Sequence, residues 1–193
     1  MDREDSTALL ARARQGSREA LNSLYGRVAA KLLAIVRLRL GPSLRARLES
    51  RDILQAALLR SFERLEQFDG RDSQSLMSWL ARIAENEIRD RADYFGRQRR
   101  DAALDVPIED TAVGVPGVAR SVLSRMLIDE RSTRLVHALE ELPVHHREII
   151  VLRKLEERTF PEIGSRLGKS EDACRMLFAR AMAALTLRLK DEP

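Results

Sequence analysis

Apolar residues recur at intervals of three and four along almost the whole chain, and this spacing predicts helices rather than strands. The clearest run lies between Ser17 and Gly41, where one helical face carries Leu21, Leu24, Tyr25, Val28, Leu32 and Ile35. A stripe of this kind must be buried against other helices. Because 44% of the 193 residues are hydrophobic, the chain can bury such faces, and we expect an all-α fold.

One long stretch lacks the helical spacing. The segment "DAALDVPIEDTAVGVPGV", residues 101–118, combines prolines and glycines with small side chains. This composition is typical of a linker, because proline and glycine interrupt regular structure. We therefore expect two small helical domains, residues 1–101 and 129–193, joined by a flexible linker at 102–128.

Local signals divide the first domain into helices. Ser6 can begin a short helix that ends near Gly16, and Ser17 can cap the long helix that "GPS" at 41–43 interrupts. A further helix is expected over about 51–68. The polar stretch "FDGRDSQS" then predicts a loop, and the helix "LMSWLARIAENEIRDRADYFGRQRRD" becomes basic at its far end.

The stretch "TFPEIGSRLGKSEDACR" predicts two helices joined by a very short turn. Thr159 and Glu162 have the spacing of a capping box, which begins a helix at about Phe160. Gly168 can adopt the left-handed conformation that closes this helix, and Ser170 can cap the next one. The result is a helix-turn-helix motif.

The second helix of this motif has distinct inner and outer faces. Ile163, Leu167, Cys174, Leu177 and Phe178 are expected to pack the two helices together, which leaves Asp172, Arg175, Met176 and Ala179 outside. Such a helix fits the DNA major groove, where Arg175 could donate two hydrogen bonds to a guanine while Lys169 and Arg180 meet phosphates. The alternative is an ordinary helical hairpin in a bundle.

Composition excludes several classes of protein and site. The net charge of +4 favours an anionic partner only weakly. One cysteine forms no disulfide framework, and neighbouring His145 and His146 point about 100° apart on a helix, so no metal site is expected. No segment approaches the roughly 20 apolar residues that span a bilayer. We expect a cytoplasmic protein without a cofactor.

Residues 51–100 and 138–185 together resemble the second and fourth regions of bacterial RNA polymerase sigma factors of the extracytoplasmic-function group. The resemblance implies an alternative sigma factor for transcription initiation, with no catalytic chemistry of its own. Such a protein binds core RNA polymerase, recognises the minus-35 and minus-10 promoter elements and promotes DNA melting. A separate anti-sigma protein is a plausible further partner.

The resemblance also implies the contact with core polymerase. The family's D-x-x-Q pattern falls on Asp52 and Gln55, which would bind the clamp helices of the largest polymerase subunit. The next position is usually acidic in the family, whereas this chain has Ala56. A structural alternative is that Asp52 only favours the helix dipole near an N-terminus.

The minus-10 contacts implied by the resemblance lie on the polar loop and the helix after it. The loop would capture a flipped base and Asn86 would line its pocket, since an amide offers a base edge both a donor and an acceptor. Asn86 could instead be a solvated residue, and Trp79 is interpreted as core because it repeats in register with other apolar residues. The minus-10 set is Asp69, Arg71, Asn86, Arg97, Arg99 and Arg100.

The minus-35 contacts implied by the resemblance lie on the helix-turn-helix. Ala173 and Cys174 stand where many members have threonine and valine, so fewer side chains can bond to bases. We expect readout through Arg175, apolar contacts with thymine methyls and DNA shape, with Cys174 as a core residue. The minus-35 set is Lys169, Ser170, Asp172, Ala173, Arg175, Met176 and Arg180.

Two other functions remain open from the sequence. A one-component helix-turn-helix regulator would bind duplex DNA without polymerase. A helical enzyme is the third class, but the chain has no nucleophile paired with a base and no phosphate-binding glycine loop.

Overall fold

The computed structural model describes residues 6–70, 73–100 and 130–191. The first half consists of α1 (Ser6–Arg14), α2 (Arg18–Arg39), α3 (Pro42–Arg45), α4 (Ser50–Glu63), the 3-10 turn η1 (Leu65–Gln67) and α5 (Ser73–Arg100). The second half consists of α7 (Glu130–Glu140), α8 (Val144–Ile150), the π-helical turn η2 (Val151–Leu155), α9 (Phe160–Leu167) and α10 (Glu171–Asp191).

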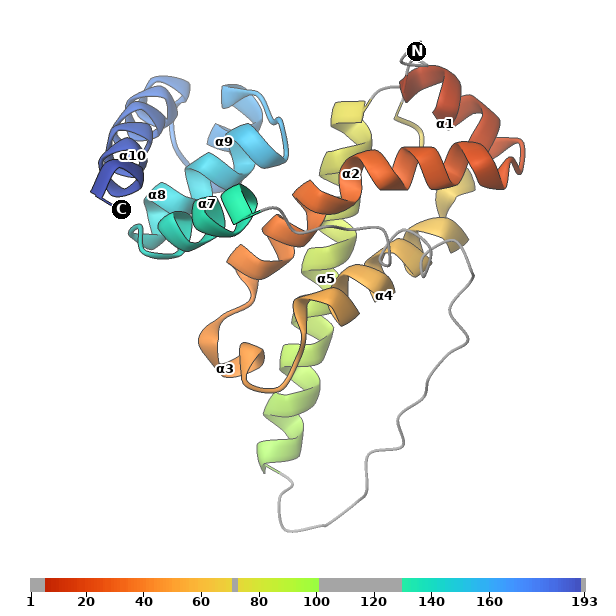
Figure 1. Cartoon of the computed structure of the whole chain (residues 1–193), viewed down its shortest axis with the longest axis horizontal. Coiled ribbons are helices and arrows are strands. Elements are labelled where there is room, and N and C mark those ends of the chain that lie inside the picture. Colours follow the sequence, from red (N-terminus) through yellow and green to blue (C-terminus); the bar gives the residue numbers. More distant parts are fainter. Residues whose placement is uncertain (1–5, 71–72, 101–129, 192–193) are drawn as a thin grey trace.

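Every regular element in the described part of the chain is helical, which confirms the all-α prediction (Figure 1). The predicted linker, 102–128, lies outside the described residues. The proposed domain bounds, 1–101 and 129–193, stay a prediction.

Helix α2 is the central element of the first half. It packs against α1, α4 and α5 (Figure 1). Because α2 has neighbours on several sides, almost every one of its turns carries buried side chains. Ser17 caps α2 as predicted, accepting a hydrogen bond from the Ala20 amide at 3.3 Å. Tyr25 and Ser61 share a buried hydrogen bond of 2.6 Å that ties α2 to α4, and burial raises the pKa of Tyr25 to about 12.

The expected helix over 51–68 is wrong at its C-terminal end. Helix α4 stops at Glu63, and η1 follows it. Leu65 and Phe68 are both buried beyond this break, and the Phe68 ring packs against Trp79 of α5. Helix α5 begins at Ser73, which makes the loop before it shorter than the sequence indicated.

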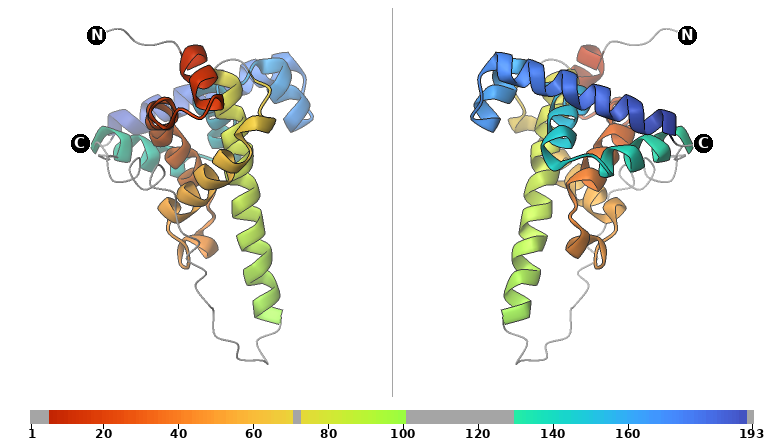
Figure 2. Two further views of the ribbon diagram at one scale, coloured as in Figure 1. Left: turned by 90° about the vertical axis from the view of Figure 1, so that its right-hand side faces the viewer. Right: turned by 90° about the vertical axis from the view of Figure 1, so that its left-hand side faces the viewer.

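The second half is a small bundle in which α10 packs across α7, α8 and α9 (Figure 2). Its fully buried centre comes from several different elements: Ala138, Ile149, Leu152, Ile163, Cys174 and Ala181. Cys174 is therefore a core residue, as expected from its helical face.

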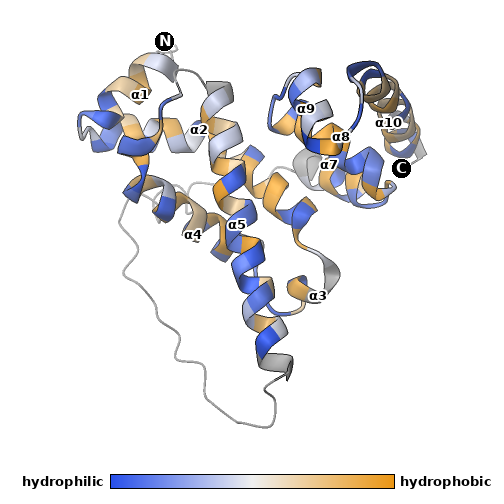
Figure 3. Ribbon diagram, turned by 180° about the vertical axis from the view of Figure 1, so that it is seen from behind, coloured by the Kyte–Doolittle hydropathy of each residue, from blue (hydrophilic) through white to orange (hydrophobic). Residues whose placement is uncertain are grey.

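The two halves contact each other through α2 on one side and α7 and η2 on the other (Figure 1). The C-terminal part of α5 instead extends away from the other helices (Figure 2). Its residues there are mostly hydrophilic (Figure 3). Residues beyond the contact with α4, such as Arg91 and Asp93, are accordingly exposed.

Candidate functional site

The junction between α9 and α10 is built by local hydrogen bonds. The Thr159 amide donates to the Glu162 carboxylate at 2.7 Å, and the Glu162 amide donates to the Thr159 hydroxyl at 3.5 Å, which confirms the capping box. These bonds from the Thr159 backbone and side chain hold the pKa of Glu162 below its ordinary value. Gly168 is left-handed, with φ 63° and ψ 37°, as predicted.

Gly164 makes the turn unusually close. Its carbonyl accepts hydrogen bonds from the Gly168 amide and, at 3.0 Å, from the Lys169 amide. A Cβ atom at Gly164 would lie only 2.6 Å from the Lys169 carbonyl oxygen. Gly164 is absent from the sequence predictions, although a glycine inside a short helix is a signal of close backbone approach.

The inner face of the motif is packed as predicted. Ile163 and Cys174 are fully buried, while Leu167 and Leu177 are half-buried against the same core. The rings of Phe160 and Phe178 meet edge to face with their centroids 5.8 Å apart, a favourable aromatic geometry. Helix α10 is therefore held rigidly against α9.

The outer face of α10 is exposed, but its arginine is not free. Asp172, Ala173 and Met176 lie in solvent, and 58% of Met176 is accessible. Arg175 forms an ion pair with Glu171 one turn earlier, and its guanidinium lies 4.8 Å from the centroid of the Phe160 ring. To contact a partner beyond the helix surface, Arg175 must break its ion pair with Glu171.

The remaining residues of the predicted minus-35 set frame this face. The Ser170 hydroxyl accepts from the Ala173 amide at 3.2 Å, so it caps α10 as expected. Lys169 and Arg180 are exposed near the N-terminus and the middle of α10. The structure thus places this set along the first half of α10 and the turn before it, from Lys169 to Arg180.

The predicted polymerase contact lies at the start of α4, in the other half. Asp52 is exposed in the first turn, and Gln55 and Ala56 are half-buried one turn later. Asp52 is therefore also placed to favour the helix dipole.

The described part of the polar loop is anchored from α1. The Arg14 guanidinium donates to the carbonyl oxygens of Phe68 and, at 3.2 Å, of Gly70, and it lies 5.4 Å from the centroid of the Phe68 ring. Asp69 is exposed between these two residues. No local signal points to Arg14, which is distant from the loop in sequence.

Asn86 and the loop lie toward the same side of α5. The Phe68 ring contacts Trp79 at a centroid distance of 4.9 Å, and Trp79 is half-buried against the core, as expected. Asn86 follows Trp79 by about two helical turns, so the two residues share a face. Asn86 is half-buried and accepts a hydrogen bond from Arg89 at 3.3 Å.

The basic end of α5 is described only in part. Arg97 is exposed. The side chains of Arg99 and Arg100, and the whole of Arg71, lie outside the described residues.

Two kinds of feature, membrane-spanning helices and metal-binding clusters, are absent from the described residues 6–70, 73–100 and 130–191. No helix there combines the length and apolar character that crossing a bilayer requires. No group of three histidine, cysteine or acidic side chains there could hold a metal ion.

Comparison with protein families gives two matches. Residues 24–100 match the family model described as sigma-70 region 2, and residues 132–185 match that of sigma-70, region 4. Among curated proteins, the chain is 28% identical to the ECF RNA polymerase sigma factor SigD of Mycobacterium tuberculosis, over 100% of this chain and 85% of SigD.

A second relative has higher identity over a shorter stretch. The RNA polymerase sigma factor CarQ of Myxococcus xanthus is 30% identical over 86% of each chain. Among solved structures, CnrH in its complex with the cytosolic domain of CnrY has a TM-score of 0.52 and 22% identity, over 98% of this chain and 100% of that one. At this identity the likeness concerns the fold alone.

Proposed function

We propose roles for the individual surfaces of this chain, which belongs to the extracytoplasmic-function group of the sigma-70 family. It is an alternative sigma factor for transcription initiation, and nothing in the comparisons supports a one-component regulator. The start of α4 contacts core polymerase, the loop at Asp69 with α5 binds the minus-10 element, and the start of α10 binds the minus-35 element.

The α4 surface is assigned by its residues and their exposure. Asp52 and Gln55 carry the family's D-x-x-Q pattern, and both have side chains accessible to a partner. Ala56 lacks the carboxylate that is usual at this position, so Asp52 carries the negative charge of the contact.

Replacing both residues, Asp52→Ala with Gln55→Ala, should weaken binding to core polymerase by about 10-fold or more, because a polar anchor of the contact is lost. Binding of a labelled chain to core polymerase measures the effect. Glu66→Ala removes another exposed carboxylate, from η1, and is the matched control. Since Asp52 also favours the helix dipole, the unfolding free energy of each variant is measured alongside. Unchanged affinity in a folded double variant contradicts the assignment.

The minus-10 role is supported by the anchored loop and by Asn86. Arg14 restrains the backbone at Phe68 and Gly70, so the exposed residues beside them can form one wall of a base pocket. Asn86 presents an amide on the same side of α5, and Arg97 follows farther along as a phosphate contact. Arg71, Arg99 and Arg100 complete the proposal on sequence grounds.

The minus-35 role is carried by the rigid exposed start of α10. The capping box, Gly164 and Gly168 hold α10 across α9, while the outer face of α10 stays exposed. This single observation gives the best support for sequence-specific DNA binding. Arg175 would exchange Glu171 for a guanine edge on binding. Ala173 and Met176 would contact thymine methyls, while Lys169 and Arg180 meet phosphates and Ser170 and Asp172 flank the contact.

Arg175→Ala should flatten sequence preference at one minus-35 position, since a bidentate arginine discriminates bases by about 1–3 kcal/mol. Lys169→Ala should instead weaken binding about equally on all sequences and lower the salt slope by about one. Holoenzyme affinities for a panel of minus-35 substitutions at several salt concentrations separate the two behaviours. If Arg175→Ala weakened binding equally on all sequences while Lys169→Ala changed the base preference, the proposed orientation of α10 would be wrong.

Several finer assignments follow from the family and are proposed here. The chain has no catalytic activity of its own and acts in the cytoplasm with core polymerase and promoter DNA. An anti-sigma protein is a further proposed partner, on the grounds of the family to which the chain belongs. The proposed domains are residues 1–101, with polymerase and minus-10 binding, and 129–193, with minus-35 binding.

A further inference from the structure

Arg14, at the end of α1, contacts the backbone of a loop that begins 54 residues later in the sequence. One nitrogen of its guanidinium, Nη2, donates to the carbonyl oxygen of Phe68 and, at 3.2 Å, to that of Gly70. The same guanidinium lies 5.4 Å from the centroid of the Phe68 ring, within the range of a cation–π contact. One charged group therefore holds the loop by two carbonyls and one aromatic ring.

Helix α1 gives Arg14 a fixed position from which to act. Leu9, Leu10 and Ala13 are buried, and α1 packs against α2. Gly16 follows the helix with a φ of 90°, and its amide donates to the Ala13 carbonyl at 3.0 Å. The backbone of Arg14 is thus held by the core of the first half, so its side chain can position a neighbouring segment.

Gly70 shows how closely this part of the loop is packed. A Cβ atom there would lie 2.3 and 2.6 Å from two atoms of the Phe68 ring and 2.6 Å from the Cβ atom of Ser75. Phe68 is 4% exposed, and its ring centroid lies 4.9 Å from that of Trp79, so little space remains for the ring to move aside. The loop is therefore packed from inside by Phe68 and held from outside by Arg14.

The held loop presents Asp69 to solvent. Phe68 has an extended backbone, with φ −77° and ψ 116°, and successive side chains of an extended chain point to opposite sides. Because the Phe68 side chain is buried, the Asp69 side chain faces outward, and Asp69 is accordingly exposed. Arg14 holds the carbonyls before and after this residue. It therefore determines where the Asp69 carboxylate lies.

Recognition of a flipped base requires such control. A flipped base is read by hydrogen bonds to its edge, and these bonds need the protein groups within about 0.5 Å of their working positions. A loop that became ordered only on binding would lose conformational entropy at that step, which opposes binding. The Arg14 contacts order the loop before DNA arrives.

We propose that Arg14 is a positioning residue for minus-10 recognition: by holding the loop backbone on both sides of Asp69, it sets the place of that carboxylate and with it the preference for the captured base. The proposal rests on the function proposed above, in which this loop forms part of the base pocket. Arg14 acts through the loop, without a base contact of its own. Because α1 precedes residues 24–100, which match sigma-70 region 2, specificity within that region is set from a segment outside the match.

Trp79 reports the state of the loop in the free chain, because it is the single tryptophan and its ring contacts Phe68. Arg14→Met removes the donors and the charge but keeps an apolar stem. Release of the loop should expose Trp79, shifting its emission to longer wavelength and raising its quenching by acrylamide. Arg14→Lys keeps a cation with donors and should retain most of the wild-type signal. Phe68→Ala provides the signal of an uncovered Trp79.

Holoenzyme affinities for promoters substituted singly at each minus-10 base measure the consequence for specificity. Arg14→Met should lower discrimination at one position about fivefold or more, the contribution of one well-placed base contact, and leave the other positions unchanged. Arg14→Lys should rescue part of this loss. Arg18→Met removes another exposed arginine, from the start of α2, and is the matched control. The control should keep the wild-type preference at every position.

Gly70→Ala tests the same route from inside the loop. The added Cβ atom cannot fit beside the Phe68 ring unless the loop moves, so preference should fall at the same base. Since both substitutions disturb one arrangement, combining Gly70→Ala with Arg14→Met should cost no more discrimination than the stronger single change. Additive losses would show that Arg14 acts by a separate route and would overturn the proposal. Circular dichroism checks that each variant is folded.

The remaining outcomes separate this proposal from its alternatives. Unchanged Trp79 fluorescence in Arg14→Met would overturn the ordering of the loop, and unchanged base preference would overturn its role in specificity. Equal weakening on all sequences, with a salt slope lower by about one, would identify Arg14 as a phosphate contact and also overturn the proposal. A wild-type holoenzyme without preference at any minus-10 base would contradict the proposed function while leaving the fluorescence result standing.

Discussion

Gly164 is a single position where backbone approach decides the shape of the DNA-binding motif. The Lys169 carbonyl oxygen occupies the space where a side chain would begin, 2.6 Å from a Cβ atom. The obstacle is backbone rather than the end of a flexible side chain, so it can yield only if the turn between α9 and α10 moves. Gly168, by contrast, is required by its positive φ and has open space around it.

Gly164→Ala should destabilise the second half by about 1–3 kcal/mol, because overpacking at the turn outweighs the higher helix propensity of alanine. Amide hydrogen exchange in α9 and α10 measures the loss, and minus-35 binding should weaken with it. Gly26→Ala is the control: a Cβ atom at Gly26 in α2 would meet nothing within 4 Å, so this change should stabilise the first half slightly. Equal behaviour of the two variants would show that the close approach at Gly164 is unimportant.

At the scale of the element, α9 is a short helix that depends on its cap. Eight residues are too few for helix propensity alone to hold it, so the Thr159–Glu162 capping box and packing must do so. The same element carries Arg166, which reaches Glu85 in the other half. Helix α9 therefore supports both the DNA-reading helix and the contact between the halves.

The capping box predicts a pH dependence. Glu162 has a folded-state pKa below its ordinary value of 4.5, so its stabilisation is fully present above that pH and is lost as pH falls through the folded pKa. Glu162→Gln lacks this titration. The stability advantage of the wild type over Glu162→Gln, measured by amide exchange in α9, should therefore shrink as pH falls from about 7 to about 3.

Thr159→Ala gives the matching comparison at neutral pH. Loss of the N-cap should lower the free energy of unfolding by about 1 kcal/mol. An advantage of the wild type over Glu162→Gln that stays constant with pH would mean that the Glu162 charge does not stabilise the cap.

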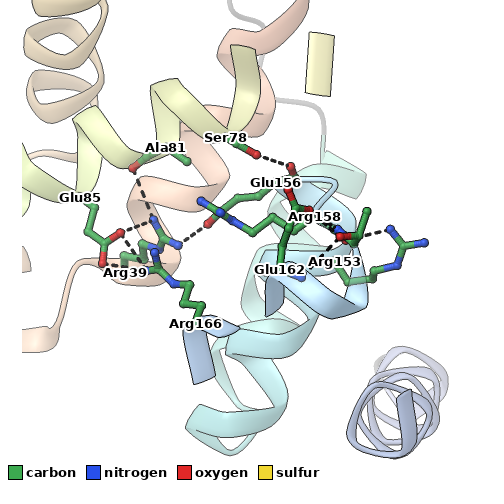
Figure 4. A network of polar contacts seen from close by, with 10 residues as sticks. Arg39, Ser78, Ala81, Glu85, Arg153, Glu156, Arg158, Glu162 and Arg166 are labelled. Carbon is green, nitrogen blue, oxygen red and sulfur yellow. Dashed lines mark hydrogen bonds and ion pairs between the residues drawn. The ribbon is translucent and has the colours of Figure 1, made fainter. Parts of the chain in front are cut away.

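For the whole molecule, ion pairs such as Arg39–Glu156 and Arg166–Glu85 lie at the contact between the two halves (Figure 4). Polar contacts of this kind separate more readily than apolar ones, so we expect the halves to unfold separately. Leu32→Ala removes a fully buried side chain from α2 and should destabilise the first half by about 2–5 kcal/mol. Trp79 is the single tryptophan and lies in that half, so its fluorescence follows this transition alone. Amide exchange in α10 should change little.

Leu187→Ala serves as the control for this experiment, since Leu187 in α10 is 63% exposed and little apolar burial is lost. Parallel loss of stability in both halves after Leu32→Ala would instead show that the chain unfolds as one cooperative unit.

The sequence by itself determined the helices and the helix-turn-helix, because their signals act within a few residues: apolar spacing, the Thr159 cap, the left-handed Gly168. It also indicated which family the chain resembles. It misjudged the end of α4, where η1 replaces the expected last turn and Phe68 packs against Trp79 of α5.

Only the tertiary structure decided the partners of the charged residues. Arg14 holds the Phe68 and Gly70 carbonyls, Arg166 reaches Glu85, and Arg39 reaches Glu156 across the chain. An arginine on a helix has several possible acceptors, and its own neighbours in sequence do not say which one will be near. That choice depends on how whole helices dock, and docking is set by apolar faces remote from the charges themselves.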